Sequence, residues 1–178
     1  MKPAALFVVL ILACGCGDAP VAPPDAQRVR EPAANTEPAP GPRAVPAASA
    51  ARDLASDERR GGHTLARHVG LSDADLRARL RRERRIAAAS TWNDRGTAER
   101  IVAATIDGSR AEVERWRRRR PPRPNLALDW RGSEAIGRTL SRGVARAVPV
   151  SCATIVLRTA PSGGDDYYVL TSYPEPCR

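Results

Sequence analysis

The chain has 178 residues, a formal net charge of +9 and only 4% aromatic residues. Residues 1–50 carry four basic and four acidic side chains, so the whole positive excess lies in residues 51–178. A segment this basic favours an anionic partner, such as a nucleic acid, an anionic lipid surface or an acidic protein. Its six aromatic residues are too few for a surface on which several bases stack.

Residues 1–16 have the features of an export signal. Lys2 is followed by the apolar run Ala4–Ala13, which is shorter than the roughly 20 residues that a membrane-spanning helix needs. The small and apolar residues before Cys14 resemble the lipobox of bacterial lipoproteins, in which the cysteine becomes the lipidated N-terminus. Cys16 is the alternative lipidation site, and an ordinary cleaved signal peptide is the other interpretation. The pattern predicts an exported chain anchored to the cell envelope by lipid.

Residues 17–50 differ in composition from the rest of the chain. They are mostly Pro and Ala, show no apolar periodicity and cannot bury enough surface to offset the entropy lost on ordering. We expect a disordered, semi-rigid tether. Residues 51–178 have the length of one domain with a single core.

Helical signals dominate the first half of this domain. Gly61-Gly62 interrupts a helical spacing, and Ser72 with Asp75 forms a capping-box pattern. Ser109 is a candidate cap for a helix that the prolines from Pro121 onward terminate. The expected helices are an interrupted one over Asp53–Val69, then Ser72–Arg85, Thr97–Ile106 and Arg110–Arg120.

The apolar pattern changes to that of strands after the prolines. The expected strands are Asn125–Trp130, Gly137–Leu140, Ser151–Thr159 and Asp166–Tyr173. The last two flank the turn cluster Ala160–Asp165 and should form an antiparallel hairpin. Helices followed by strands predict an α+β domain with an antiparallel sheet.

Two cysteines follow the signal region. A hairpin that turns near Gly163-Gly164 places Cys152 close to Cys177, which lies nearly opposite it. In an oxidising compartment such a pair can form a disulfide, and two small buried thiols are the alternative.

The histidines His63 and His68 are the natural candidates for proton transfer near neutral pH. Five residues apart, they do not share a helix face, so a catalytic pair needs a break between them. A third histidine, a Cys-x-x-Cys motif and acidic residues at ligand spacing are all missing from the sequence, so we expect neither a metal site nor a cofactor. The basic run of Arg115 and Arg117–Arg120 is open to two interpretations, a solvated helix face or a stripe that contacts phosphates.

Several blocks of the domain carry a family resemblance over about Leu54–Pro174. They are Gly61–Leu80, Ala88–Trp92, Asp94–Arg100 and Tyr168–Pro174. Together they resemble the ribonuclease A-like C-terminal domain of bacterial contact-dependent growth inhibition toxins. The resemblance implies a ribonuclease A-like fold, RNA cleavage without a metal ion and an immunity protein as partner.

The resemblance also implies an active site. It points to His68 on the first helix, Arg79 eleven residues later, and Thr171 with Tyr173 on the last strand; His63 lies in the shared block with a less certain role. The residues themselves support one part of this set, because side chains two apart on a strand share a face.

The leading hypothesis is therefore a metal-independent endoribonuclease toxin of interbacterial competition, which would act on RNA in the cytoplasm of a target cell. The toxin domain of this family normally ends a very long surface protein, whereas here it follows a lipoprotein signal and a tether. That arrangement resembles lipoprotein toxins that some bacteria exchange through their outer membranes. The alternatives are a membrane-anchored lipoprotein whose basic domain binds nucleic acid or another polyanion without cleaving it, and an inactive relative kept for its interactions.

The lipid anchor can be tested by metabolic labelling. Labelled palmitate should enter the wild-type chain and fail to enter a Cys14→Ala, Cys16→Ala double variant, because the acyl chain is attached at one of these cysteines. Equal labelling of both proteins, or of neither, would contradict the lipoprotein hypothesis.

Overall fold

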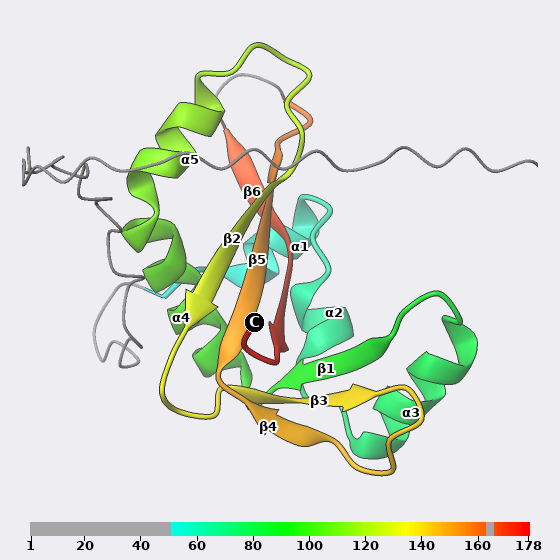
Figure 1. Ribbon diagram of the computed structural model, residues 1–178. Helices are drawn as coiled ribbons and strands as arrows, with labels where there is room; N and C mark the ends of the chain where they lie inside the picture. Colours follow the sequence, from blue (N-terminus) through cyan, green and yellow to red (C-terminus); the bar gives the residue numbers. More distant parts are fainter. Residues whose placement is uncertain (1–50, 163–165) are drawn as a thin grey trace, which may run out of the picture. The chain divides into compact units, whose positions relative to one another are not determined.

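The computed structural model describes residues 51–162 and 166–178 (Figure 1). The expected signal and tether, with Cys14 and Cys16, and the expected turn centre at Gly163-Gly164 lie outside the described residues. Within the described ranges, no helix is both long enough and apolar enough to cross a membrane.

The described residues form five helices and six strands, which alternate along the chain more than expected. The helices are α1 (Leu54–Arg59), α2 (Thr64–His68), α3 (Asp73–Arg82), α4 (Arg95–Gly108) and α5 (Arg110–Arg117). The strands are β1 (Ala88–Trp92), β2 (Leu126–Arg131), β3 (Gly137–Ser141), β4 (Val148–Val150), β5 (Cys152–Thr159) and β6 (Tyr167–Glu175).

The α+β class is confirmed, with two corrections. The strands form two antiparallel three-stranded sheets, ordered β1-β3-β4 and β2-β5-β6, rather than one. Strand β1 also lies between α3 and α4, so the helices do not all precede the strands. Strand β1 escaped prediction because four of its five residues are buried, which removes the polar-apolar alternation of a half-exposed strand.

Several helix ends also differ from expectation. Helix α3 ends at Arg82 and α5 at Arg117, each three residues earlier than predicted. The capping box of Ser72 and Asp75 is present, whereas Ser109 lies at the start of α5 without a capping side-chain hydrogen bond. Helix α4 begins two residues earlier than predicted because the side chain of Asp94 accepts a hydrogen bond from the Thr97 amide.

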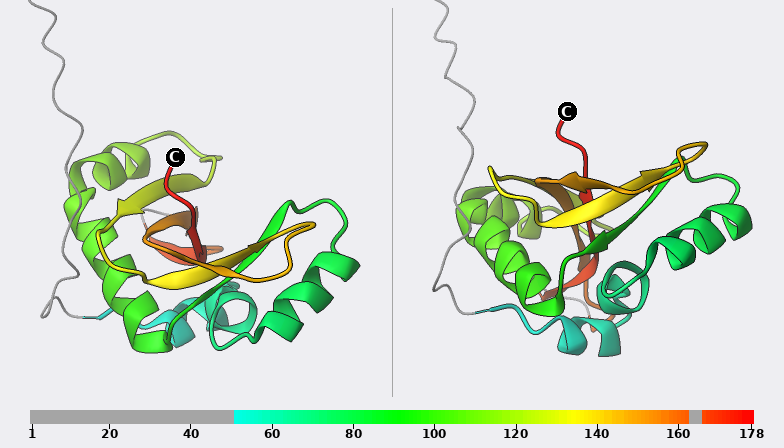
Figure 2. Two further views of the ribbon diagram at one scale, coloured as in Figure 1. Left: turned by 60° about the horizontal axis from the view of Figure 1, so that its bottom comes forward. Right: turned by 90° about the horizontal axis from the view of Figure 1, so that it is seen from below.

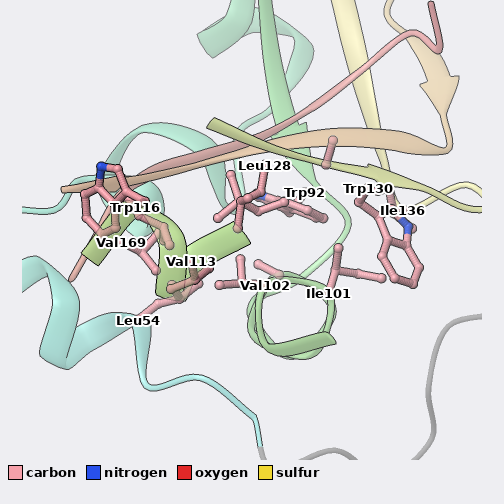
Figure 3. Packing of buried hydrophobic residues seen from close by; sticks show 14 residues of the cluster. Leu54, Trp92, Ile101, Val102, Val113, Trp116, Leu128, Trp130, Ile136 and Val169 are labelled. Atoms are coloured by element: carbon pink, nitrogen blue, oxygen red, sulfur yellow. The ribbon is translucent and has the colours of Figure 1, made fainter. Parts of the chain in front are cut away.

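Helices α4 and α5 pack on the sheet β2-β5-β6 to form the main core, and we call this part with α1 and α2 the large lobe (Figures 1 and 3). Alternation along β2 points Leu128 and Trp130 into this core and leaves Asp129 exposed. From the other sheet, Trp92 extends into the same core, and its Nε1 donates to the Ser172 carbonyl at 3.2 Å.

The small lobe, which we define as residues 71–92 and 137–150, contains α3 and the sheet β1-β3-β4. Four buried side chains form its separate core, namely Leu76, Leu80, Ala89 and Leu140. In Figure 2 this sheet and α3 extend to one side, away from α5. Each lobe therefore has its own apolar core, and they meet along β6.

The outer edge of β6 is satisfied by buried side chains instead of by another strand. Asp57 is 2% exposed, and its carboxylate accepts hydrogen bonds from the Val169 amide at 3.1 Å and from Arg52. The hydroxyl of Thr64 accepts from the Ser172 amide at 2.8 Å, and the His63 amide donates to the Leu170 carbonyl. Helices α1 and α2 are thereby held in one register along β6.

Gly62 allows this close approach. A Cβ atom at Gly62 would lie 2.5 Å from the Val169 carbonyl oxygen and 2.9 Å from that of Asp57, and both are backbone atoms. Any side chain would push α1 and α2 away from β6. The second glycine of the Gly61-Gly62-His63 block is therefore a packing requirement of the site-bearing helix.

A disulfide joins Cys152, the first residue of β5, to Cys177, which follows β6. In the sheet register Cys152 lies opposite Glu175, so the bridge closes the hairpin just beyond its last paired residues. The cross-link ties the C-terminal residues to the β2-β5-β6 sheet.

The packing at Gly62 predicts the cost of a methyl group. Gly62→Ala should lower the free energy of unfolding by about 1–3 kcal/mol, the range typical of overpacking at a rigid site. The measurement is urea denaturation. Gly96→Ala in α4 is the control, because its Cβ would meet only side-chain atoms at 3.3 Å, and alanine favours a helix. Equal stability of the two variants would show that the clash at Gly62 is unimportant.

Candidate active site

His68 lies at the end of α2, where the two lobes meet, and is 7% exposed. Its Nδ1 is 3.2 Å from the carbonyl oxygen of Ser90 on β1. A carbonyl can only accept a hydrogen bond, so Nδ1 carries the proton of the neutral ring and Nε2 is unprotonated. The backbone of β1 therefore selects the tautomer in which Nε2 can act as a base.

Arg79 on α3 lies next to that nitrogen. Its Nη1 is 3.5 Å from His68 Nε2 and donates to the Arg67 carbonyl at 2.9 Å, while its Nε is 3.3 Å from Glu83 Oε1. The guanidinium is thus held at two points, and its side chain is only 13% exposed. A cation fixed beside a base suits the binding of an anion that presents a proton to the base.

Tyr173 approaches His68 from β6, and Thr171 lies two residues before it on the same strand. The rings of His68 and Tyr173 are tilted by 34° with centroids 5.5 Å apart. Thr171 and Tyr173 pair with Val156 and Thr154 of β5 without a register shift between them, so their side chains share a face. The Thr171 hydroxyl is buried and has no hydrogen-bond partner among the described residues.

His63 lies outside α2, as the residue that precedes its first turn, with φ −153°. The chain therefore has the break between the histidines that a shared site requires. Partial burial lowers the pKa of His63, and the charges of Arg67 and Arg79 lower it further. The charge of Glu58 opposes this shift. The structure thus brings His63 within electrostatic range of Arg79 but gives its ring no direct contact with His68.

Burial lowers the pKa of His68 from its usual 6.5 to about 3, and the positive charge of Arg79 is the next cause. The hydrogen bond to Ser90 opposes this shift, whereas His63 and Arg67 add to it. His68 is therefore neutral throughout the physiological pH range. An anion bound beside Arg79 would offset that cation and make it easier for the imidazole to take up a proton.

Within residues 51–162 and 166–178, histidine, cysteine and acidic side chains form no group of three or more that could hold a metal ion. A cavity of about 550 Å³ lies elsewhere, between α1, α4 and Tyr167, and none of the five candidate residues lines it. The candidate site is therefore defined by the contacts of His68 with Arg79 and Tyr173 and not by this cavity.

Three supporting groups escaped the sequence analysis. The carbonyls of Ser90 and Arg67 orient His68 and Arg79, and backbone acceptors leave no mark in a residue pattern. The buried carboxylate of Asp57 supports β6 from α1. A signal for Asp57 existed, because it lies three residues after the buried Leu54 and so on the same helix face.

Comparison with known proteins adds independent information. The family described as "Bacterial CdiA-CT RNAse A domain" matches residues 62–174. A solved structure described as "Crystal structure of CdiA-CT/CdiI complex from Y. kristensenii 33638" is similar with a TM-score of 0.58 and 31% identity, covering 65% of this chain and 100% of that one. A search of curated proteins found no match. The family match contains all five candidate residues.

The buried neutral state of His68 predicts a pH dependence of stability. The unfolded chain binds a proton at His68 below about pH 6.5 and the folded chain does not, so stability falls as the pH drops from there toward 3. Between pH 7 and 5 the free energy of unfolding should fall by about 2 kcal/mol on account of His68 alone.

Urea denaturation of the wild type and His68→Gln at both pH values measures this contribution. His63→Gln is the matched control and should keep most of the pH dependence, because His63 is only partly buried. A His68→Gln variant with an undiminished pH dependence would show that His68 is not buried in its neutral form.

Proposed function

Because this chain belongs to the bacterial CdiA-CT RNase A family, we propose that it is an endoribonuclease toxin that cleaves RNA without a metal ion. The observation that carries the proposal is the position of His68 Nε2, which is unprotonated and lies 3.5 Å from the Arg79 guanidinium. A base beside a fixed cation is the pair of groups that attack on a phosphodiester by a neighbouring hydroxyl requires.

The proposed reaction uses the 2′-hydroxyl of RNA as its own nucleophile. His68 Nε2 takes the proton of that hydroxyl while the oxygen bonds to phosphorus, and Arg79 stabilises the charge that develops on the phosphoryl oxygens. The bond from phosphorus to the 5′ oxygen breaks, and that oxygen takes up a proton. The products are a 2′,3′-cyclic phosphate and a 5′-hydroxyl. DNA lacks the nucleophile and should not be cleaved.

The hydroxyls of Thr171 and Tyr173 complete the proposed site. Both lie on the β6 face that meets His68, and the unpartnered Thr171 hydroxyl can donate a hydrogen bond to a phosphoryl oxygen. The Tyr173 hydroxyl can supply the route for the proton that the leaving oxygen needs. His63 is the alternative donor, because its lowered pKa makes its protonated form a stronger acid.

We further propose that a specific immunity protein protects the producing cell. The related solved structure is a complex of CdiA-CT with CdiI, which supports a partner protein of that kind. The sequence supports export on a lipid anchor, which would keep the domain away from the producer's own RNA until delivery. The toxin would then act on RNA in the cytoplasm of the recipient.

The activity can be tested on purified protein. It should degrade single-stranded RNA in the presence of EDTA and leave 2′,3′-cyclic phosphate ends, detected by mass spectrometry. His68→Ala should lower kcat by about 10²- to 10⁴-fold, the usual loss of a general base. Arg79→Ala should lower kcat by a similar factor. Arg118→Ala is the control and should keep the wild-type kcat, because Arg118 is exposed. A large loss of kcat in His63→Ala would assign the proton donor to His63, and an unchanged kcat would leave that role to Tyr173.

Two results would overturn the proposal. If RNA stays intact both with and without a divalent metal ion, the protein is not a nuclease, and the alternative of a basic binding domain holds. Activity that disappears with EDTA and returns with a divalent metal ion would retain the nuclease and reject the metal-independent mechanism.

A further inference from the structure

Positive charge is concentrated on the small lobe. Its residues include nine arginines and three acidic residues, a net charge of +6 within a chain of +9. The arginines are Arg77, Arg79, Arg81, Arg82, Arg84, Arg85, Arg138, Arg142 and Arg146. Two thirds of the net charge therefore lies on the lobe that supplies Arg79 to the candidate site.

Some of these arginines have a structural task. Arg77 donates to the Ala145 carbonyl, Arg138 to the Leu71 carbonyl, and Arg142 to the carbonyls of Glu83 and Ile86. The hydrogen bonds of Arg142 hold the turn after α3 in place. Because Arg142 is itself a cation, it adds a positive charge to this part of the surface.

Four further arginines around the end of α3 are exposed to solvent. We call them the turn arginines: Arg81 and Arg82 are the last two residues of α3, and Arg84 and Arg85 follow the helix. Among the described residues, none of the four forms an ion pair, and Glu83 is already paired with Arg79. Their mutual repulsion favours an anionic ligand with several charges.

We propose that the turn arginines bind the phosphates of an RNA strand next to the one that is cleaved. The inference rests on the proposed function, because it takes the scissile phosphate to lie beside Arg79. Arg79 and Arg82 are three apart on α3 and so share a helix face, and Arg84 and Arg85 continue from the helix end. Arg82 is thus about one helical turn from Arg79, and Arg84 and Arg85 come next along the chain, so several cations follow the one at the site. An RNA strand carries a charge on every nucleotide and can contact more than one of them.

RNA fits this surface better than an acidic protein does. Guanidinium groups that bind phosphates need no apolar contact, and the four exposed positions within residues 81–86 are all arginines. The arrangement also predicts a preference for substrates of several nucleotides. A single phosphodiester reaches Arg79 alone, whereas a longer strand reaches the turn arginines as well.

A second arginine cluster provides a matched control. Arg118, Arg119 and Arg120 follow α5 and are equally exposed. Helices α5 and α3 lie at opposite ends of the described domain in both figures that show them (Figures 1 and 2). Replacing either set of three arginines by glutamine removes the same charge, so a difference between the variants reports position and not net charge.

The experiment measures binding of a fluorescent 15-nucleotide 2′-O-methyl RNA, which cannot be cleaved, between 50 and 200 mM salt. The variant Arg82→Gln, Arg84→Gln, Arg85→Gln should lower the slope of log K against log salt concentration by about 2. Each phosphate contact on a single strand contributes roughly 0.7 to that slope, and the variant removes three contacts. Over this salt range the wild type should then lose roughly 10- to 20-fold more affinity than the variant. The variant with Arg118, Arg119 and Arg120 changed to glutamine should keep the wild-type slope.

Cleavage of a dinucleotide should be unchanged in both triple variants, because its one phosphate reaches only Arg79. Equal loss of slope in the two variants would overturn the proposal in favour of general electrostatics. An unchanged slope in the turn variant would also overturn it and leave the turn arginines to an acidic protein partner. Because binding is measured without cleavage, a protein that binds in this way but leaves RNA intact would contradict the proposed function and retain only the phosphate contacts of the turn arginines.

Discussion

The whole site depends on how the outer edge of β6 is satisfied. A sheet edge presents unpaired amides and carbonyls, and here the buried Asp57 carboxylate and the Thr64 hydroxyl accept from two of those amides. These bonds permit one register of α2 along β6. Since His68 ends α2 and Tyr173 is on β6, that register sets the distance between them.

The small lobe is attached to the same strand. The indole of Trp92 and the hydroxyl of Thr139 donate to the carbonyls of Ser172 and Pro174, which joins the β1-β3-β4 sheet to β6. Helix α3 packs on that sheet and carries Arg79, so the cation reaches His68 through a chain of rigid contacts. The candidate site is thus assembled from four elements, namely α2, α3, β1 and β6.

Sequence reasoning found what periodicity and short-range chemistry encode. It predicted the α+β class and the capping box at Ser72, and the hairpin spacing brought Cys152 and Cys177 together as candidates for pairing. It missed β1, whose burial on both faces hides the strand period, and the division of the strands into two sheets. The candidate site residues came from family resemblance. Their orientation by backbone carbonyls such as that of Ser90 depends on tertiary packing and has no local signature.

The cross-link between Cys152 and Cys177 makes the domain sensitive to the redox state of its surroundings. The two cysteines are 25 residues apart, and closing a loop of that length stabilises a folded chain by about 3.5 kcal/mol in a chain-entropy treatment. In any compartment that keeps thiols reduced, the same sequence lacks this contribution. The hairpin that carries Thr171 and Tyr173 is then less firmly closed, so the reduced domain is less stable than the cross-linked one.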